Sequence, residues 1–141
     1  RKMALLMVDI DRFKAINDIF GNSAGDQLLQ LVAGKLKARL RDLDLIARFG
    51  SDEFIVFLEN ADSMEHVSAI AENIISDLSQ PFNLTRSKDV RIGVNIGISL
   101  YPEHADSAEM LLEQADVALY QAKDRGRGGY VYFSENFIRT L

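Results

Sequence analysis

The sequence predicts an α+β domain in which helices flank a mostly antiparallel central sheet. Three observations lead to this fold class. Two strand-like runs, residues 45–49 and 54–58, surround a turn-forming segment at residues 50–53 (GSDE) and therefore predict a β-hairpin. Residues 91–100 alternate strictly between apolar and other side chains, which indicates a strand. Elsewhere apolar residues recur at helical spacing, so the predicted order of elements is βααββαβαβ.

The first two elements are a strand and a short helix. Residues 3–10 form a continuous apolar run that ends in acid, as expected of a strand buried on both faces. Phe13, Ile16 and Phe20 then fall on one helical face, and Gly21 ends that helix.

Two longer amphipathic helices are predicted to follow. Ser23, with Asp26 three residues later, predicts a capping box that opens the second helix. The third helix, which comes after the hairpin, ends before Pro81. Their apolar stripes consist of Leu28, Val32, Leu36 and Leu40 in the second helix, and of Val67, Ile70, Ala71, Ile74, Ile75 and Leu78 in the third.

The remaining elements are the strand at residues 91–100, a fourth helix and a closing strand at residues 130–133. Asp106 or Ser107 is expected to cap the fourth helix. Residues 133–141 have the character of the start of a helical connector. The apolar stripe of the fourth helix consists of Ala108, Leu111, Leu112, Ala115, Ala118, Leu119 and Ala122.

Composition narrows the class of protein. A chain of 141 residues suits one domain, and the absence of cysteine excludes disulfides, thiolate zinc sites and thiol nucleophiles. The 16 basic and 21 acidic residues give a net charge of −5, which argues against nucleic acid or an anionic membrane as the main partner. Residues 3–8 are too few to span a bilayer, and no signal-peptide pattern precedes them. These features predict a cytoplasmic domain.

Several familiar catalytic and binding motifs are absent. The two histidines, His66 and His104, stand in neither a nucleophile nor a metal-ligand spacing. No GxxxxGK[ST] loop occurs. Asp9-Ile10-Asp11 could begin a calcium loop, but Lys14 stands where that loop requires glycine.

Carboxylates at strand ends and turns remain as candidates. Asp9 closes the first strand, while Asp52 and Glu53 lie in the hairpin, so these acids converge if the two strands are neighbours. Hard oxygen ligands held in this way suit Mg²⁺, which reverses the local charge for a substrate phosphate. The alternative is that Asp9 and Asp11 are a strand-end and a helix-cap acid, and that Asp52 is a turn acid. Spacing alone leaves both interpretations open.

Taken together, the motifs resemble the GGDEF family, the diguanylate cyclase domains of bacterial signalling proteins. The resemblance covers nearly the whole chain, and we assign residues 1–141 to a single domain of this type that lacks the family's usual DxLT…NR-like start. The signature hairpin departs from the family at one position, where Ser51 replaces the second glycine. The matching segments are residues 8–14 (VDIDRFK), 16–18 (IND), Gly21 with 24–26 (AGD), 48–54 (RFGSDEF), 115–123 (ADVALYQAK) and Gly126-Arg127.

The resemblance implies a ferredoxin-like, nucleotide-cyclase-type sandwich and a reaction. Two GTP molecules condense to cyclic di-GMP and two pyrophosphates, with two Mg²⁺ ions in each active site and Mn²⁺ able to substitute. Two domains face each other as a homodimer to complete the product. Sensor or phosphodiesterase domains are expected in the full-length protein, including ones that anchor it to a membrane.

The same resemblance implies roles for individual acids. Asp9, the Ile10 carbonyl and Asp52 match metal-binding positions. Asp52 also matches the residue that accepts the proton of the attacking 3′-hydroxyl, and Glu53 beside it matches a catalytic position that serves the second metal.

Substrate-binding positions are implied in the same way. Asn17 and Asp26 match residues that contact the guanine edge, and Asn22 stands where the family often has histidine. The alternative is that Asn17 and Asp26 only cap helices. The remaining matches are Gly50 and Ser51 of the hairpin, and Lys123 and Arg127, which match phosphate clamps but could instead complement the dipole of the fourth helix.

Arg41 and Asp44 form an RxxD motif just upstream of the signature. In the family such a motif forms the site of product inhibition. Arginine suits a guanine Hoogsteen edge and a phosphate, whereas aspartate suits the Watson–Crick donors. Without the family, a helix-end arginine followed by a turn acid is the simpler interpretation.

Two hypotheses about function follow. The first is an active diguanylate cyclase with activity reduced by Ser51, because serine adds a Cβ where glycine permits a positive φ and close approach of the nucleotide. The alternative is a degenerate module that binds GTP or cyclic di-GMP and regulates an attached domain. An RNA-binding domain is disfavoured by the negative charge and the absence of an aromatic RNP pattern.

Overall fold

The computed structural model describes residues 2–85 and 87–134, and within them the predicted order of elements is confirmed. The boundaries differ from the predicted ones by one or two residues, which is the usual uncertainty at the ends of elements. The elements are β1 (Met3–Asp11), α1 (Phe13–Phe20), α2 (Asn22–Ala38), β2 (Leu45–Arg48), β3 (Glu53–Leu58), α3 (Met64–Leu78), β4 (Gly93–Tyr101), α4 (Ala108–Asp124) and β5 (Tyr130–Tyr132).

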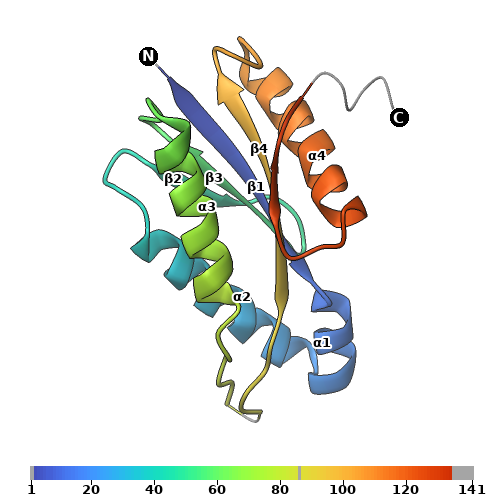
Figure 1. Ribbon diagram of the computed structural model, residues 1–141. Coiled ribbons are helices and arrows are strands. Elements are labelled where there is room, and N and C mark those ends of the chain that lie inside the picture. The colour runs from blue at the N-terminus through green and yellow to red at the C-terminus, as the bar shows by residue number, and fades with distance from the viewer. Residues whose placement is uncertain (1, 86, 135–141) are drawn as a thin grey trace.

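The strands form one sheet in the order β2-β3-β1-β4-β5 (Figure 1). All neighbouring pairs are antiparallel except β4 and β5, which are parallel. The predicted fold class, an α+β sandwich with a mostly antiparallel sheet flanked by helices, is therefore confirmed. Because β1 lies between β3 and β4, both of its edges are hydrogen-bonded, as expected for an unbroken apolar run.

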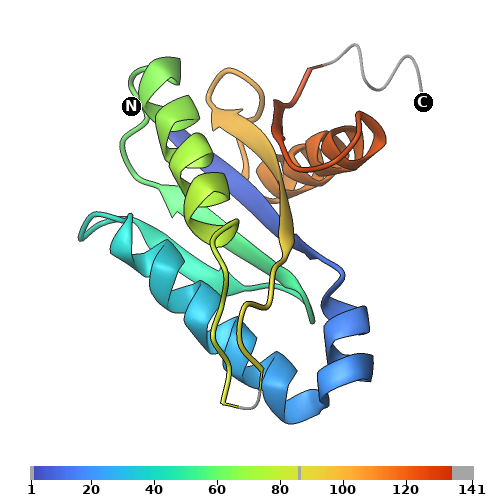
Figure 2. The ribbon, with the colours of Figure 1, turned by 60° about the horizontal axis from the view of Figure 1, so that its bottom comes forward.

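Helices cover both faces of the sheet (Figures 1 and 2). The larger core joins α2 and α3 to one face, on which Leu6 and Val8 of β1 are buried. A smaller core joins α4 to the other face, where the alternate residues Leu5 and Met7 pack. Burial on both faces explains why the sequence of β1 is apolar throughout rather than alternating.

The alternation of β4 sorts its side chains between these two layers. Ile96 and Ile98 belong to the larger core, whereas Ser99 lies on the opposite face and donates a hydrogen bond to the Leu111 carbonyl of α4, at 2.7 Å. Gly97 faces α4 as well. A Cβ on Gly97 would overlap the Ala115 carbonyl and the Leu119 nitrogen, so α4 can approach β4 this closely only because residue 97 is glycine.

Helix capping is only partly as predicted. The capping box at Ser23 and Asp26 is wrong, because α2 already begins at Asn22 and has no side-chain cap. Gly21, with φ of 93°, makes the corner between α1 and α2, and glycine tolerates such a positive φ. Ser107 rather than Asp106 caps α4 by accepting a hydrogen bond from the Met110 amide.

No helix among the described residues is long and apolar enough to cross a membrane. The predicted connector at residues 133–141 lies outside the described residues from 135 onward.

We predict that Gly97→Ala destabilises the fold by at least the roughly 1–3 kcal/mol typical of overpacking, because the added methyl meets backbone atoms that cannot rotate away. Gly34→Ala is the matched control. Gly34 is exposed on α2 with open space around it, so alanine should stabilise the helix by about 0.5–1 kcal/mol. Urea unfolding of both variants measures the difference, and equal stability of the two would contradict the packing argument.

Candidate functional site

The candidate site lies where β1 ends beside the hairpin that joins β2 to β3. The Ile10 amide donates to the Asp52 carbonyl at 3.0 Å, and Asp9 is paired in register with Glu53. The sequence prediction that these acids converge at one edge of the sheet is confirmed, because β1 and β3 are neighbours.

Asp9 is a buried carboxylate, with 4% of the residue exposed. Its Oδ2 lies 3.1 Å from the Lys123 Nζ of α4. Burial raises the pKa of Asp9 above its usual value, the Lys123 ammonium opposes this, and the charges of Asp52 and Asp11 add to it. The interpretation of Asp9 as a plain strand-end acid does not account for a carboxylate kept this far from water.

Glu53 shares this electrostatic environment. Partial burial raises its pKa, and the negative charges of Asp9, Asp116 and Asp52 raise it further. Asp116 belongs to α4 and lies in the family-like segment 115–123, although its residue type and spacing predict no role for it. Spacing alone could not have found it, since only the packing of α4 on the sheet brings it near the hairpin.

The donor set at this edge suits a hard divalent cation. Among residues 2–85 and 87–134, no three His, Asp or Glu side chains are grouped closely enough to form a complete metal cage. Mg²⁺ needs no such cage, because it keeps several waters and takes one or two carboxylates together with substrate phosphates. The buried Asp9 carboxylate, whose negative charge is only partly offset by Lys123, fits this kind of site.

The two candidate phosphate clamps lie beside these acids. Lys123 is in the last turn of α4, and its ammonium reaches Asp9 rather than the helix end. Arg127 follows α4 in a glycine-rich loop and forms an ion pair with Asp11. Both residues therefore form ion pairs with these acids, contacts that the helix-dipole interpretation alone does not predict. Asp11 caps no helix either, because the N-cap of α1 is Arg12 and it has no side-chain hydrogen bond.

The residues predicted to contact guanine meet at the corner between α1 and α2. The Asn17 side chain lies against Gly25, where any Cβ would overlap the amide oxygen. Asn17 Oδ1 is buried and has no partner among the described residues, so it does not cap a helix. Asp26, exposed in α2, is one residue further along, and Asn22 begins that helix.

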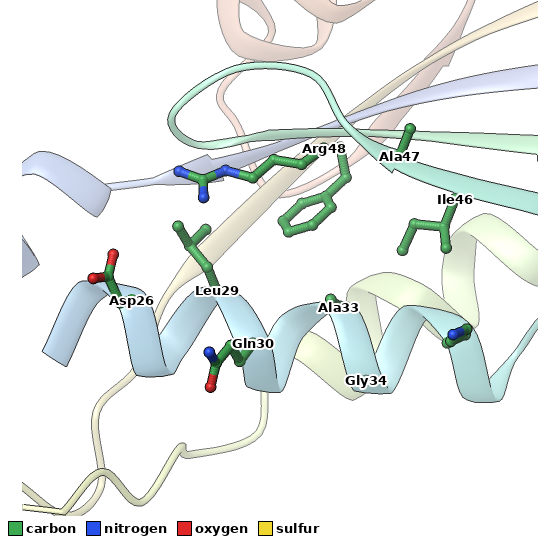
Figure 3. Close-up of a pocket in the computed structure, with 10 residues that line it drawn as sticks. Asp26, Leu29, Gln30, Ala33, Gly34, Ile46, Ala47 and Arg48 are labelled. Atoms are coloured by element: carbon green, nitrogen blue, oxygen red, sulfur yellow. The ribbon is translucent and has the colours of Figure 1, made fainter. Parts of the chain in front are cut away.

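A groove of about 480 Å³ runs from Asp26 along α2 beneath β2 (Figure 3). Leu29 and Phe54 supply apolar walls, and Arg48 extends over the end that holds Asp26. Arg48 also donates to the carbonyls of Gly50 and Ser51, at 3.1 and 3.0 Å. Arg48 therefore holds the hairpin in place. This role was not predicted from the sequence, although Arg48 is the first residue of the signature segment 48–54.

The hairpin accommodates Ser51 without backbone strain. The Phe49 and Gly50 amides both donate to the Glu53 carbonyl, which closes the turn. Ser51 is exposed and is not among the non-glycine residues with positive φ. The expectation that this position requires a glycine conformation is therefore wrong for this turn.

Asp44 has a structural role near Arg41. Its two carboxylate oxygens accept hydrogen bonds from the Arg41 and Glu59 amides, each at 2.9 Å. Arg41 is exposed, and its guanidinium makes no hydrogen bond or ion pair with the described residues. Both residues line an open pocket of about 550 Å³ with Glu59 and Asn60. The contacts of Asp44 are therefore those of an acid that stabilises a turn.

The fold is an α+β sandwich of the nucleotide-cyclase type, and carboxylates and cations meet at one edge of its sheet. The family model described as "Diguanylate cyclase, GGDEF domain" matches residues 1–129, and the chain belongs to this family. The resemblance inferred from the motifs is confirmed.

Two relatives illustrate the similarity. The bifunctional diguanylate cyclase/cyclic di-GMP phosphodiesterase MucR of Pseudomonas aeruginosa is 41% identical over 96% of this chain and 20% of its own length. The diguanylate cyclase TpbB of the same species is 45% identical over 90% of this chain and 29% of its own. This chain therefore spans well under half the length of these curated relatives.

Solved structures agree with the sequence comparison. The isolated GGDEF domain of TpbB has a TM-score of 0.94 at 43% identity, covering 99% of this chain and 81% of that one. The GGDEF domain of DgcB from Caulobacter crescentus, solved with c-di-GMP, has a TM-score of 0.84 at 28% identity, covering 93% and 77%.

We predict that Glu53→Gln raises the melting temperature at pH 7 in the absence of divalent metal. Because folding raises the pKa of Glu53, the folded state holds this proton more tightly than the unfolded chain, and the ionised group destabilises the fold. The destabilisation develops as pH rises through the ordinary carboxylate range and disappears below it. Thermal unfolding at pH 4 and pH 7, with the exposed Glu113→Gln as control, checks this, and a wild type as stable as Glu53→Gln at pH 7 would contradict it.

Proposed function

We propose that this chain is a diguanylate cyclase domain that condenses two GTP molecules to cyclic di-GMP and two pyrophosphates. The observation that carries the proposal is the grouping of Asp9, Asp52 and Lys123 at the joined ends of β1 and the hairpin. Phosphoryl transfer needs positioned oxygens and neutralised charge more than covalent chemistry, and this edge of the sheet offers both acids and cations.

In the proposed reaction the 3′-hydroxyl of one GTP attacks the α-phosphorus of the other. Asp52 accepts the hydroxyl proton as the new P–O bond forms and the bond to pyrophosphate breaks. Two Mg²⁺ ions per site, with Mn²⁺ able to substitute, would supply neutralising positive charge to the phosphate oxygens when bound. Asp9, the Ile10 carbonyl and Asp52 would hold metal, with Glu53 serving the second ion.

The remaining site residues orient the substrate in this proposal. The unpartnered Asn17 Oδ1 and the Asp26 carboxylate accept from the N1 and N2 donors of guanine. Lys123 and Arg127 exchange their carboxylate partners for phosphate oxygens, a charge-assisted contact. Asn22, Gly50 and Ser51 line the approach to the nucleotide.

Each domain would bind one of the two GTP molecules that form the cyclic product, so two copies must face each other. The name of MucR, which combines cyclase and phosphodiesterase activities, supports a full-length protein with further domains. Cyclic di-GMP inhibition through Arg41 and Asp44 is the finer part of the proposal, and the complex of DgcB with c-di-GMP supports product binding in the family.

We expect Asp52→Asn to lower cyclic di-GMP formation at least about 100-fold, as for loss of a general base, and Asp9→Asn to do so by weakening metal binding. Chromatography of the products from GTP and Mg²⁺ measures both. The exposed Asp106→Asn, at the opposite end of α4 from Lys123, should retain activity. Full activity of either site variant, with an unchanged circular dichroism spectrum, would refute the assignment.

The second candidate function, a regulatory module that binds GTP without turnover, is motivated by Ser51. We expect the wild type to make product and Ser51→Gly to raise turnover by opening the approach to the hairpin backbone. Stability should change by less than about 1 kcal/mol, because Ser51 holds no positive φ that glycine would relieve. GTP binding without product in both proteins would favour the regulatory module.

For the product site, we expect Arg41→Ala to weaken cyclic di-GMP binding roughly 5- to 150-fold, the equivalent of losing one bidentate contact of about 1–3 kcal/mol. Arg41→Lys keeps the charge but not the planar fork, so it should bind with intermediate affinity. Calorimetry is the measurement. Equal affinities for wild type and Arg41→Ala would refute the product site and leave Arg41 and Asp44 with a purely structural role in the turn.

A further inference from the structure

A second feature lies beside the candidate active site, on the far side of Asp11. A pocket of about 650 Å³ opens between the end of β1, the start of β4 and the loop after α4. Three arginines from separate parts of the chain meet there, although the protein as a whole carries a charge of −5. Its lining consists of Asp11, Arg12, Arg91, Ile92, Gly93, Gly126, Arg127 and Gly128.

The positive charge of this pocket is only partly compensated. Arg127 pairs with Asp11, the one acid among the lining residues. Arg91 pairs with Asp89 at 3.2 Å, but both side chains are exposed, so the pair is weak and easily exchanged. Arg12 makes no ion pair with the described residues. Two guanidinium groups are therefore available to an anion.

Backbone strain is concentrated at the same place. Three non-glycine residues in the described chain have positive φ: Arg12 at 66°, Asp89 at 59° and Arg127 at 65°. Two of them line the pocket, and the third is the partner of Arg91. Conformations of this kind are costly and tend to persist where function requires a side chain in a fixed place.

The loop that carries Arg127 is fixed from behind by Asn95. This side chain is fully buried on β4, opposite Asp9, and its Oδ1 accepts a hydrogen bond from the Gly128 amide at 2.8 Å. Its Nδ2 is buried without a partner among the described residues. A buried amide with one unsatisfied end is expensive, so this residue calls for an explanation beyond stability.

Backbone amides of the loop are not free to bind an anion. The Gly126 amide donates to the Lys123 carbonyl, and the Arg127 amide donates to the Ala122 carbonyl. The Gly128 amide donates to Asn95 Oδ1. Within this loop the group left to bind an anion is the Arg127 guanidinium, and guanidinium groups match phosphate oxygens in a bidentate manner.

We propose that Arg12 and Arg91 bind the two terminal phosphates of the nucleoside triphosphate beside Arg127, and that Asn95 is the positioning residue that holds the Arg127 loop. This inference rests on the proposed cyclase function and adds the residues that hold the leaving pyrophosphate. Asp11 and Asp89 serve as the partners of Arg127 and Arg91 until the phosphates replace them.

Binding of magnesium pyrophosphate to the 141-residue chain, measured by calorimetry, tests the first part without any turnover. Arg12→Ala and Arg91→Ala should each weaken binding roughly 10-fold or more, the effect expected from losing a hydrogen bond to a charged group. Lys2→Ala removes one positive charge near the opposite end of β1, where Lys2 pairs with Glu103, and should leave the affinity unchanged. Arginine variants that bind as tightly as Lys2→Ala, or a wild type that binds no pyrophosphate, would overturn the proposal.

A comparison of nucleotides separates this inference from the cyclase proposal. GTP should lose affinity in both arginine variants, whereas GMP, which lacks the terminal phosphates, should bind wild type and variants equally. Equal losses for GMP and GTP would overturn the inference. If the arginine variants lose pyrophosphate affinity but the wild type forms no cyclic di-GMP, the phosphate subsite stands and the cyclase proposal fails.

A double-mutant cycle tests the role of Asn95. If Asn95 acts through Arg127, Asn95→Ala should weaken pyrophosphate binding in the wild type and add nothing in an Arg127→Ala background. Ser99→Ala removes a buried hydrogen bond from the same face of β4 to α4, so it should lower the melting temperature without changing the affinity. Additive effects of Asn95→Ala and Arg127→Ala would overturn the positioning role.

Discussion

The close approach of α4 to β4 at Gly97 is the constraint on which the rest of the site depends. With no side chain at residue 97, the backbone of α4 rests directly on the strand, and the Ser99 hydroxyl ties the two together at Leu111. This contact sets the depth at which the C-terminal turn of α4 lies over the end of β1. Lys123 reaches the buried Asp9 for this reason, and Arg127 reaches Asp11.

The cost of this arrangement is a set of acids held in unfavourable surroundings. Burial and mutual repulsion raise the pKa of both Asp9 and Glu53, so the folded chain carries charge that a purely structural edge would avoid. Stability is therefore lowered at this edge by like charges held together, a pattern that functional sites often show. The core formed by β1, β4, α2 and α3 supplies the stability that this edge gives up.

The corner between α1 and α2 also depends on glycines that leave space for a polar side chain. Gly21 permits the sharp turn, and Gly25 leaves room for the Asn17 side chain, whose Oδ1 has no partner among the described residues. Two glycines thus bring an amide and the neighbouring Asp26 together at one end of the groove beneath β2.

The sequence by itself determined the order of elements, the hairpin, the family and the strand-end acids, because apolar periodicity and short motifs are local properties of the chain. A local pattern was misleading at the start of the second helix. Ser23 and Asp26 suggested a capping box, but α2 begins at Asn22 with Gly21 as its N-cap. Only the tertiary structure decided which residues lie beside Asp9, Asp11 and Glu53. Asp116, Arg91 and Asn95 stand far from Asp9 in the sequence, and they come near it through strand pairing and the packing of α4 on the sheet. These contacts join distant parts of the chain, and no local spacing encodes them.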